Sequence, residues 1–245
     1  MENFKIRWFH WAAPQSFYPL AGRLWPFFGL IAAVMALAAL YLGFFVAPTD
    51  FQQGEGYRII FVHVPASWMS MVIYLAMAFW AFLGFTFNTR LSGMMTQALA
   101  PTGAMFTFLS LWTGALWGKP MWGAWWVWDA RLTSVFVLFL FYLAYMALRA
   151  AIDDEAKGAR AAAILALVGL VNVPVVHWSV EWWNTLHQGR TVFAAGGSRA
   201  ASVFLVPLLL MSLSYMAGFG SLWLVRIRGE VWRRRAAAAE ARLAR

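Results

Sequence analysis

The stretch WPFFGLIAAVMALAALYLGFFV, residues 25–46, contains no charged residue. A helix needs about 20 mostly apolar residues to cross a bilayer, so this stretch predicts a transmembrane helix. Five further stretches of the same kind follow, at roughly 65–87, 95–116, 132–150, 160–178 and 202–225. The sequence therefore predicts an all-α polytopic membrane protein, a six-transmembrane-helix bundle that forms a single integral membrane domain over residues 1–245.

The composition agrees with a membrane chain. Hydrophobic residues make up 62% of the sequence and charged residues 12%, which is about half the charged fraction of a soluble domain. The absence of cysteine excludes disulfides, thiolate metal ligands and thioether attachment of a cofactor by this chain. Much of the net charge of +9 lies in one run, RIRGEVWRRR, residues 226–235. Beside a span, such a run faces anionic lipid, and we expect no nucleic-acid partner.

Lysine and arginine are distributed unequally between the two sides of the predicted spans. The N-terminal segment, the second and fourth loops and the tail carry fourteen of them, and the other loops carry five. Because positive charge accumulates on the cytoplasmic side, both termini are predicted to be cytoplasmic, with residues 226–245 as a basic tail. Loops at roughly 47–64, 117–131 and 179–201 then face outward, which is the periplasm in a bacterium.

The third loop is unusually rich in tryptophan. It begins WGKPMWGAWWVWDARLTS at residue 117. If the segment is helical, Trp122, Trp125 and Trp126 share one face, which Asp129 continues. Such a face would be a flat platform for a large planar ligand, because indole rings stack well. The alternative is an aromatic belt at the membrane surface, and the spacing alone leaves both interpretations open.

Three histidines lie near the predicted outer side. Pro65 is typical of the first turn of a helix, which places His63 just outside the second span. His187 follows in the fifth loop, whereas His177 falls at the end of the fifth span and is expected to be buried and hydrogen-bonded. Neutral imidazole is a common axial ligand of haem iron, and His187 is a better candidate ligand than His177.

These segments resemble the tryptophan-rich haem-handling membrane proteins of cytochrome c maturation, most closely the family of haem exporter protein C, the C subunit of that system. Besides the tryptophan-rich segment, the resemblance covers QQGEGYRIIFVHVPASW at 52–68 and NVPVVHWSVEWWNTLHQG at 172–189. The length and the six spans also fit. It implies that residues 117–131 form a periplasmic haem-binding loop.

The resemblance also implies a site and a set of partners. His63 and His187 would be the axial ligands of a non-covalent, bis-histidine haem b. The implied haem-facing residues are Trp117, Trp122, Trp125, Trp126, Trp128 and Asp129. The implied partners are a periplasmic haem chaperone (the E subunit), the A and B subunits of an ABC transporter, a small single-span D subunit and membrane lipid. The implied location is the bacterial inner membrane, with the haem site facing the periplasm.

The leading hypothesis is a haem-binding scaffold, not an enzyme, that presents haem to the periplasmic chaperone. Two alternatives are a transporter that moves haem through its own bundle and a membrane cytochrome that transfers electrons. Transport or a redox relay would be supported by ionisable residues inside the spans. The predicted spans contain almost none away from their ends, which favours the scaffold.

Overall fold

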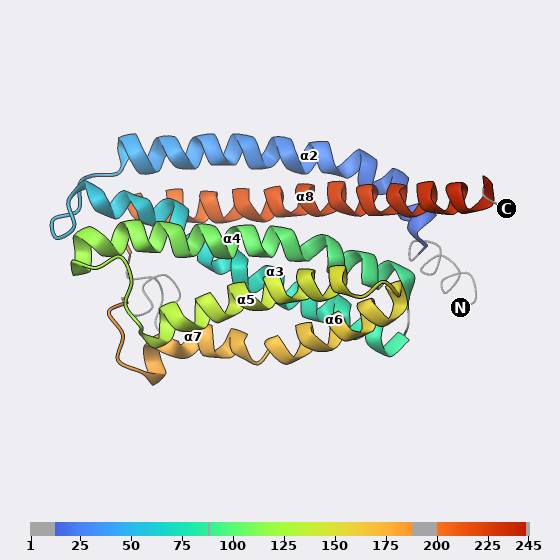
Figure 1. The fold of residues 1–245 in the computed structure, drawn as a ribbon. Coiled ribbons are helices and arrows are strands. Elements are labelled where there is room, and N and C mark those ends of the chain that lie inside the picture. The colour runs from blue at the N-terminus through green and yellow to red at the C-terminus, as the bar shows by residue number, and fades with distance from the viewer. Residues whose placement is uncertain (1–12, 88, 188–199, 244–245) are drawn as a thin grey trace, which may run out of the picture.

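The computed structural model describes residues 13–87, 89–187 and 200–243, which are almost entirely helical (Figure 1). The elements are α2 (Pro14–Tyr41), the π-helical turn η1 (Leu42–Val46), the 3₁₀ turn η2 (Glu55–Ile59), α3 (Ile60–Phe87), α4 (Arg90–Trp122), α5 (Ala130–Ala151), α6 (Glu155–Gly169), α7 (Asn172–Trp182) and α8 (Ser202–Leu243). Six segments of the described chain are long and apolar enough to cross a membrane, with α6 and α7 together forming the fifth. The predicted all-α, six-span membrane architecture is confirmed.

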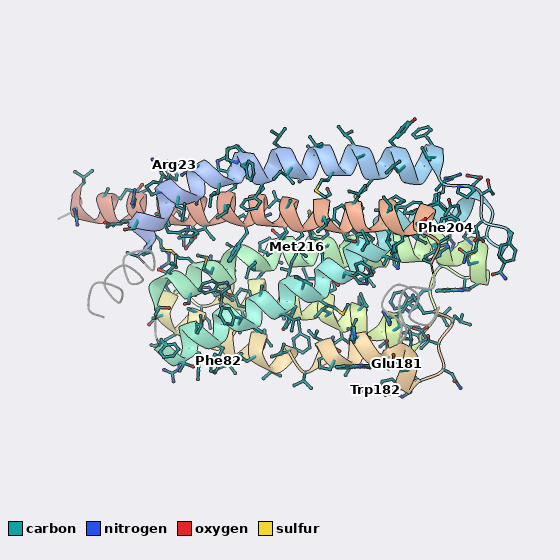
Figure 2. The ribbon with its side chains drawn as sticks, turned by 180° about the vertical axis from the view of Figure 1, so that it is seen from behind. Arg23, Phe82, Glu181, Trp182, Phe204 and Met216 are labelled. Atoms are coloured by element: carbon teal, nitrogen blue, oxygen red, sulfur yellow. The ribbon has the colours of Figure 1, made fainter. Side chains whose placement is uncertain are left out.

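The helices run roughly parallel to one long axis, and α2 and α8 lie side by side along one flank (Figure 1). α2 begins and α8 ends at the same end of the bundle, which we call the terminal end. At the opposite end, here called the site end, α3 begins, α4 ends, α5 begins and α7 ends. From behind, Glu181, Trp182 and Phe204 lie at the site end, whereas Arg23 and Phe82 lie toward the terminal end (Figure 2).

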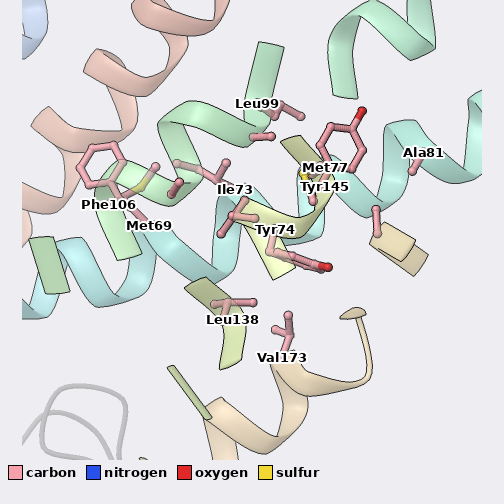
Figure 3. Close-up of a cluster of buried hydrophobic side chains, with 14 of the residues drawn as sticks. Met69, Ile73, Tyr74, Met77, Ala81, Leu99, Phe106, Leu138, Tyr145 and Val173 are labelled. Carbon is pink, nitrogen blue, oxygen red and sulfur yellow. The ribbon is translucent and has the colours of Figure 1, made fainter. Parts of the chain in front are cut away.

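The main core lies among α3, α4, α5, α6 and α7. Figure 3 shows part of it, including Met69, Ile73, Leu99, Leu138 and Val173. Tyr142 is fully buried there, and its hydroxyl donates a 2.8 Å hydrogen bond to the carbonyl oxygen of Ser70. This bond satisfies a buried polar group and joins α5 to α3.

Small polar side chains hold α2 against α8. The hydroxyl of Ser214 donates to the carbonyl oxygen of Ala32 at 2.7 Å, and that of Ser221 to the carbonyl oxygen of Trp25 at 2.8 Å. Such contacts are typical of membrane helices, which associate through close packing and interhelical hydrogen bonds. Exposed large apolar side chains recur along α2 at helical spacing, namely Phe27, Leu30, Val34, Leu37 and Tyr41. In a membrane this face meets lipid or another apolar span.

Helix ends differ from the sequence prediction at three places. α3 begins at Ile60, so Pro65 lies within the helix and His63 is helical rather than outside the span. The 3₁₀ turn before α3 already shapes the chain, and a proline near a helix start removes only one backbone bond. α4 continues through Trp122, so the predicted loop 117–131 shortens to 123–129. The tail after residue 225 continues α8 as far as Leu243.

Candidate functional site

A pocket at the site end brings together segments that are distant in the sequence. The space between its lining atoms amounts to about 520 Å³, a volume that includes open solvent. It is lined from α3 by His63, Ser67 and Met71, from α4 by Ser110, Leu111, Gly114, Ala115 and Trp122, from α5 by Arg131, Leu132 and Val135, from α7 by Val176, and from the connecting loops by Trp126 and His187. Both histidines implied by the resemblance therefore line one pocket.

His63 enters the pocket from the first turns of α3. Its side chain is almost fully buried, with a relative exposure of 8%. Nδ1 lies 3.0 Å from Oγ1 of Thr113 on α4, and the imidazole packs edge-on against the Trp117 ring at 5.7 Å. The remaining ring nitrogen, Nε2, is therefore the atom available to a ligand.

His187 reaches the pocket from the loop after α7. Its Nδ1 lies 3.5 Å from Oδ2 of Asp129, and its ring centroid is 5.0 Å from that of Trp122. Burial lowers the pKa of the imidazole, although the carboxylate of Asp129 acts in the opposite direction. His187 is thus more buried than a simple loop position suggests, and the neutral form that binds metals is favoured.

Asp129 also fixes the local backbone. Its Oδ1 accepts a 2.7 Å hydrogen bond from the backbone nitrogen of Leu132, which caps the N-terminus of α5. Its Oδ2 lies 3.5 Å from Nδ1 of His187, and neither atom has a hydrogen-bond partner among the described residues. One carboxylate therefore caps a helix and faces a histidine.

Gly123 determines how the tryptophans are arranged. It has φ 76°, a left-handed conformation that suits glycine, and its N–H bonds the carbonyl oxygen of Lys119 to end α4. Trp122 is consequently the last helical residue, and Trp125 and Trp126 follow in an irregular segment. The interpretation of these three rings as one helical face is wrong, because the helix stops between them.

The tryptophan side chains fall into two groups. Trp122 and Trp126 line the pocket, and the buried Nε1 of Trp126 has no hydrogen-bond partner within the described structure. Trp125 and Trp128 lie outside the pocket lining and are 55% and 74% exposed. Trp117 contacts His63 and donates from Nε1 to Oε1 of Gln53 at 3.0 Å.

The pocket wall also carries a positive charge. Arg131 lines the pocket, and its Nε donates to the hydroxyl of Ser179 at 2.9 Å, which joins the start of α5 to α7. A guanidinium here suits a ligand with a carboxylate edge. The indole N–H of Trp126, which has no hydrogen-bond partner among the described residues, offers a further donor.

The other histidines lie elsewhere. His177 is exposed on α7 and packs edge-on against Trp178 at 4.9 Å, so the expected burial of His177 is wrong. α7 turns this position away from the packed side of the helix, where Val176 and Ser179 are buried. His10 lies outside the described residues.

Sequence reasoning missed part of the pocket. The pocket residues Ser67, Ser110 and Gly114, and Thr113, which contacts His63, come from inside predicted spans, where they resemble ordinary helix-packing residues. Their only signal is a cluster of hydroxyl groups and glycine within an otherwise apolar run. The hydroxyls of Ser67 on α3 and Ser110 on α4 are joined by a 2.6 Å hydrogen bond. Both residues line the pocket together with His63.

The residues that line the pocket suit a planar ligand that already contains a metal ion. Among the described residues, no cluster of three or more His, Cys, Asp or Glu side chains has the arrangement to hold a bare metal ion. In haem proteins generally, two imidazoles can fill the two axial positions of the iron, whose other ligands come from the porphyrin. Trp122 and Trp126 add flat aromatic walls.

Comparison with known proteins gives a consistent picture. The family model described as heme exporter protein C matches residues 7–242. The chain is similar to heme exporter protein C of Bradyrhizobium diazoefficiens, with 44% identity covering 91% of this chain and 85% of that protein. It is similar to that of Haemophilus influenzae, with 43% identity covering 92% of each chain. It is 50% identical to that of Escherichia coli K12 over 74% of each chain.

Proposed function

Because the chain belongs to the family of haem exporter protein C, we propose that it is a membrane scaffold that presents haem at the periplasmic face and delivers it to a periplasmic haem chaperone during cytochrome c maturation. The observation that carries this proposal is the convergence of His63 and His187 on one pocket with Trp122 and Trp126. Haem is the cargo of such a scaffold, and the chain itself performs no covalent step.

His63 and His187 are the proposed axial ligands of a non-covalent haem b. In both imidazoles Nδ1 faces an oxygen atom of a neighbouring side chain, Thr113 or Asp129, which leaves Nε2 for iron. An oxygen acceptor opposite the non-ligating nitrogen is the usual arrangement around metal-bound histidine. Filling both axial positions holds the haem for transfer and leaves no site for oxygen.

The walls of the pocket would hold the porphyrin itself. Trp122 and Trp126 give aromatic contact with its plane, and Arg131 supplies positive charge for its carboxylates. The ring of Trp117 packs edge-on against the imidazole of His63. The exposed rings of Trp125 and Trp128 then remain for contact with the chaperone.

The proposed setting is the bacterial inner membrane, with both termini cytoplasmic. The Lys and Arg bias supports this sidedness, and the pocket then faces the periplasm because its lining residues lie at the site end. The proposed partners are the chaperone E subunit, the ABC transporter A and B subunits and the single-span D subunit. The position of both histidines near the site end favours hand-over to an external partner over passage of haem through the bundle or electron transfer across it.

The test is to purify the protein in detergent and record absorption and electron paramagnetic resonance spectra. We expect a six-coordinate low-spin haem in the parent protein. His63→Ala and His187→Ala should each lose that signal while retaining some haem through the other ligand and the aromatic walls. His177→Ala, which removes an exposed imidazole, is the control and should keep the parent spectrum. Retention of the low-spin signal in His187→Ala would contradict the ligand assignment.

A further inference from the structure

A hydroxyl group of α4 faces the buried imidazole of α3. We propose that Thr113 is a positioning residue that holds His63 in the tautomer with its proton on Nδ1, so that the lone pair on Nε2 is directed to the pocket. The inference deepens the proposed function and rests on it, since the haem is what Nε2 would bind.

The direction of the hydrogen bond follows from counting protons. The hydroxyl of Thr113 has one hydrogen, and its Oγ1 lies 2.6 Å from the carbonyl oxygen of Leu109, one helical turn earlier. A carbonyl oxygen only accepts, so the hydroxyl donates to it. With its hydrogen directed at Leu109, Oγ1 is an acceptor toward Nδ1 of His63, which lies 3.0 Å away, and we infer that this nitrogen carries the hydrogen.

The surroundings hold this arrangement in place. His63 is 8% and Thr113 6% exposed, so water does not readily replace either partner. Below them, the hydroxyl of Ser67 donates to the carbonyl oxygen of His63 at 3.0 Å and meets the hydroxyl of Ser110 at 2.6 Å. α3 and α4 are therefore joined on the same turn that carries the histidine, and the ring has little freedom to flip.

The next residue on α4 leaves room for the ring. A Cβ added at Gly114 would lie 3.0 Å from Cε1 of His63, closer than most side-chain contacts. Thr113 thus supplies a hydrogen-bond acceptor for Nδ1 of His63, and Gly114, which has no side chain, leaves room for Cε1.

The control for Thr113 is Thr107 on the same helix. Its hydroxyl donates to the carbonyl oxygen of Gly103 at 2.7 Å, the same bond to the preceding turn, and the residue is fully buried. Among the described residues, the hydroxyl of Thr107 bonds its own helix and not an imidazole. Thr107→Val therefore reproduces the loss of a buried hydroxyl in α4 without touching His63.

The first measurement uses haem-free protein labelled with ¹⁵N-histidine. The chain has only four histidines, and His63→Ala identifies the signal of His63. We expect the parent and Thr113→Ser to show the proton on Nδ1, and Thr113→Val to show a mixture of tautomers. Thr107→Val should match the parent. A parent protein with its proton on Nε2 would overturn the proposal even if Thr113→Val failed to fold.

The second measurement uses the haem-loaded protein. Loss of an acceptor behind a metal-bound histidine typically weakens metal affinity about ten- to a hundredfold, and we expect this for Thr113→Val, with recovery in Thr113→Ser. The reduction potential should rise, because the imidazole donates less electron density to iron. Unchanged affinity and potential in Thr113→Val would contradict the role. If the parent itself bound no haem, the proposed function would fail, while the tautomer measurement would still decide the part played by Thr113.

Discussion

Oδ2 of Asp129 lies 3.5 Å from Nδ1 of His187, while Oδ1 of the same carboxylate accepts from the backbone nitrogen of Leu132. The first contact belongs to the proposed haem site and the second to the start of α5. Because one side chain makes both, the position of His187 depends on how α5 begins. The two roles can be separated by substitution.

Asp129→Asn should keep the helix cap, since asparagine is as good an N-cap as aspartate, but it removes the charge opposite His187. We expect near-parental stability and haem affinity lowered about tenfold or more. Asp129→Ala should lose about 1 kcal/mol of stability in addition. Asp154→Ala is the control, because Asp154 caps α6 in the same way at the far end of the bundle. If Asp154→Ala weakened haem binding equally, the contact between Asp129 and His187 would have no specific role.

The two groups of tryptophans should behave differently. Trp122→Phe and Trp126→Phe each reduce an aromatic contact worth about 0.5–1.5 kcal/mol, so a several-fold loss of haem affinity is expected. Trp125→Phe and Trp128→Phe alter exposed rings and should leave affinity unchanged while slowing transfer to the chaperone. Haem titration and a transfer assay with purified chaperone measure the two effects. Equal losses of affinity in all four variants would contradict the division.

Gly114→Ala tests how closely the wall of α4 approaches His63. The new Cβ would lie 3.0 Å from Cε1, and the ring must move by a few tenths of an ångström. We expect a shifted haem absorption band and lower affinity. Gly93→Ala on the same helix meets nothing within 4 Å, and it should bind haem normally with stability equal to or about 0.5–1 kcal/mol above the parent. A normal spectrum in Gly114→Ala would show that the ring position is not restricted here.

The sidedness can be tested with fusions to alkaline phosphatase, which is active only outside the cytoplasm. A fusion at the C-terminus should be inactive, and one inserted between residues 123 and 129 should be active. A fluorescent protein that folds in the cytoplasm should give the reverse pattern at the C-terminus. An active C-terminal phosphatase fusion would overturn the orientation and with it the periplasmic site.

The membrane fold could be predicted because apolar length alone separates a span from a loop. Residues 25–46, for example, all fall within α2 and η1. Helix ends were harder, because α3 passes through Pro65 and α4 continues to Gly123. α3 follows directly from a 3₁₀ turn, and α4 ends at the left-handed Gly123, and the apolar pattern alone identifies neither feature.

The site could be predicted only in part. His63, His187, Trp122 and Trp126 were all named from the sequence, and the structure places them on one pocket. The exposure of Trp128 depends on the path of a short irregular segment, which no periodicity describes. Thr113 could not be identified, because its contact with His63 joins different helices and a threonine within a span has no distinctive pattern.

α8 continues without interruption for 42 residues, from the site end to beyond the start of α2. At about 1.5 Å per residue it is about 60 Å long, roughly twice the hydrocarbon thickness. A continuous helix resists twisting about its axis. The direction in which its final arginines point is therefore set by the residues that pack within the bundle. One residue inserted near Gly229 would turn everything beyond it by about 100°. The direction in which the basic end of α8 points is therefore set by the packing of the helix within the bundle.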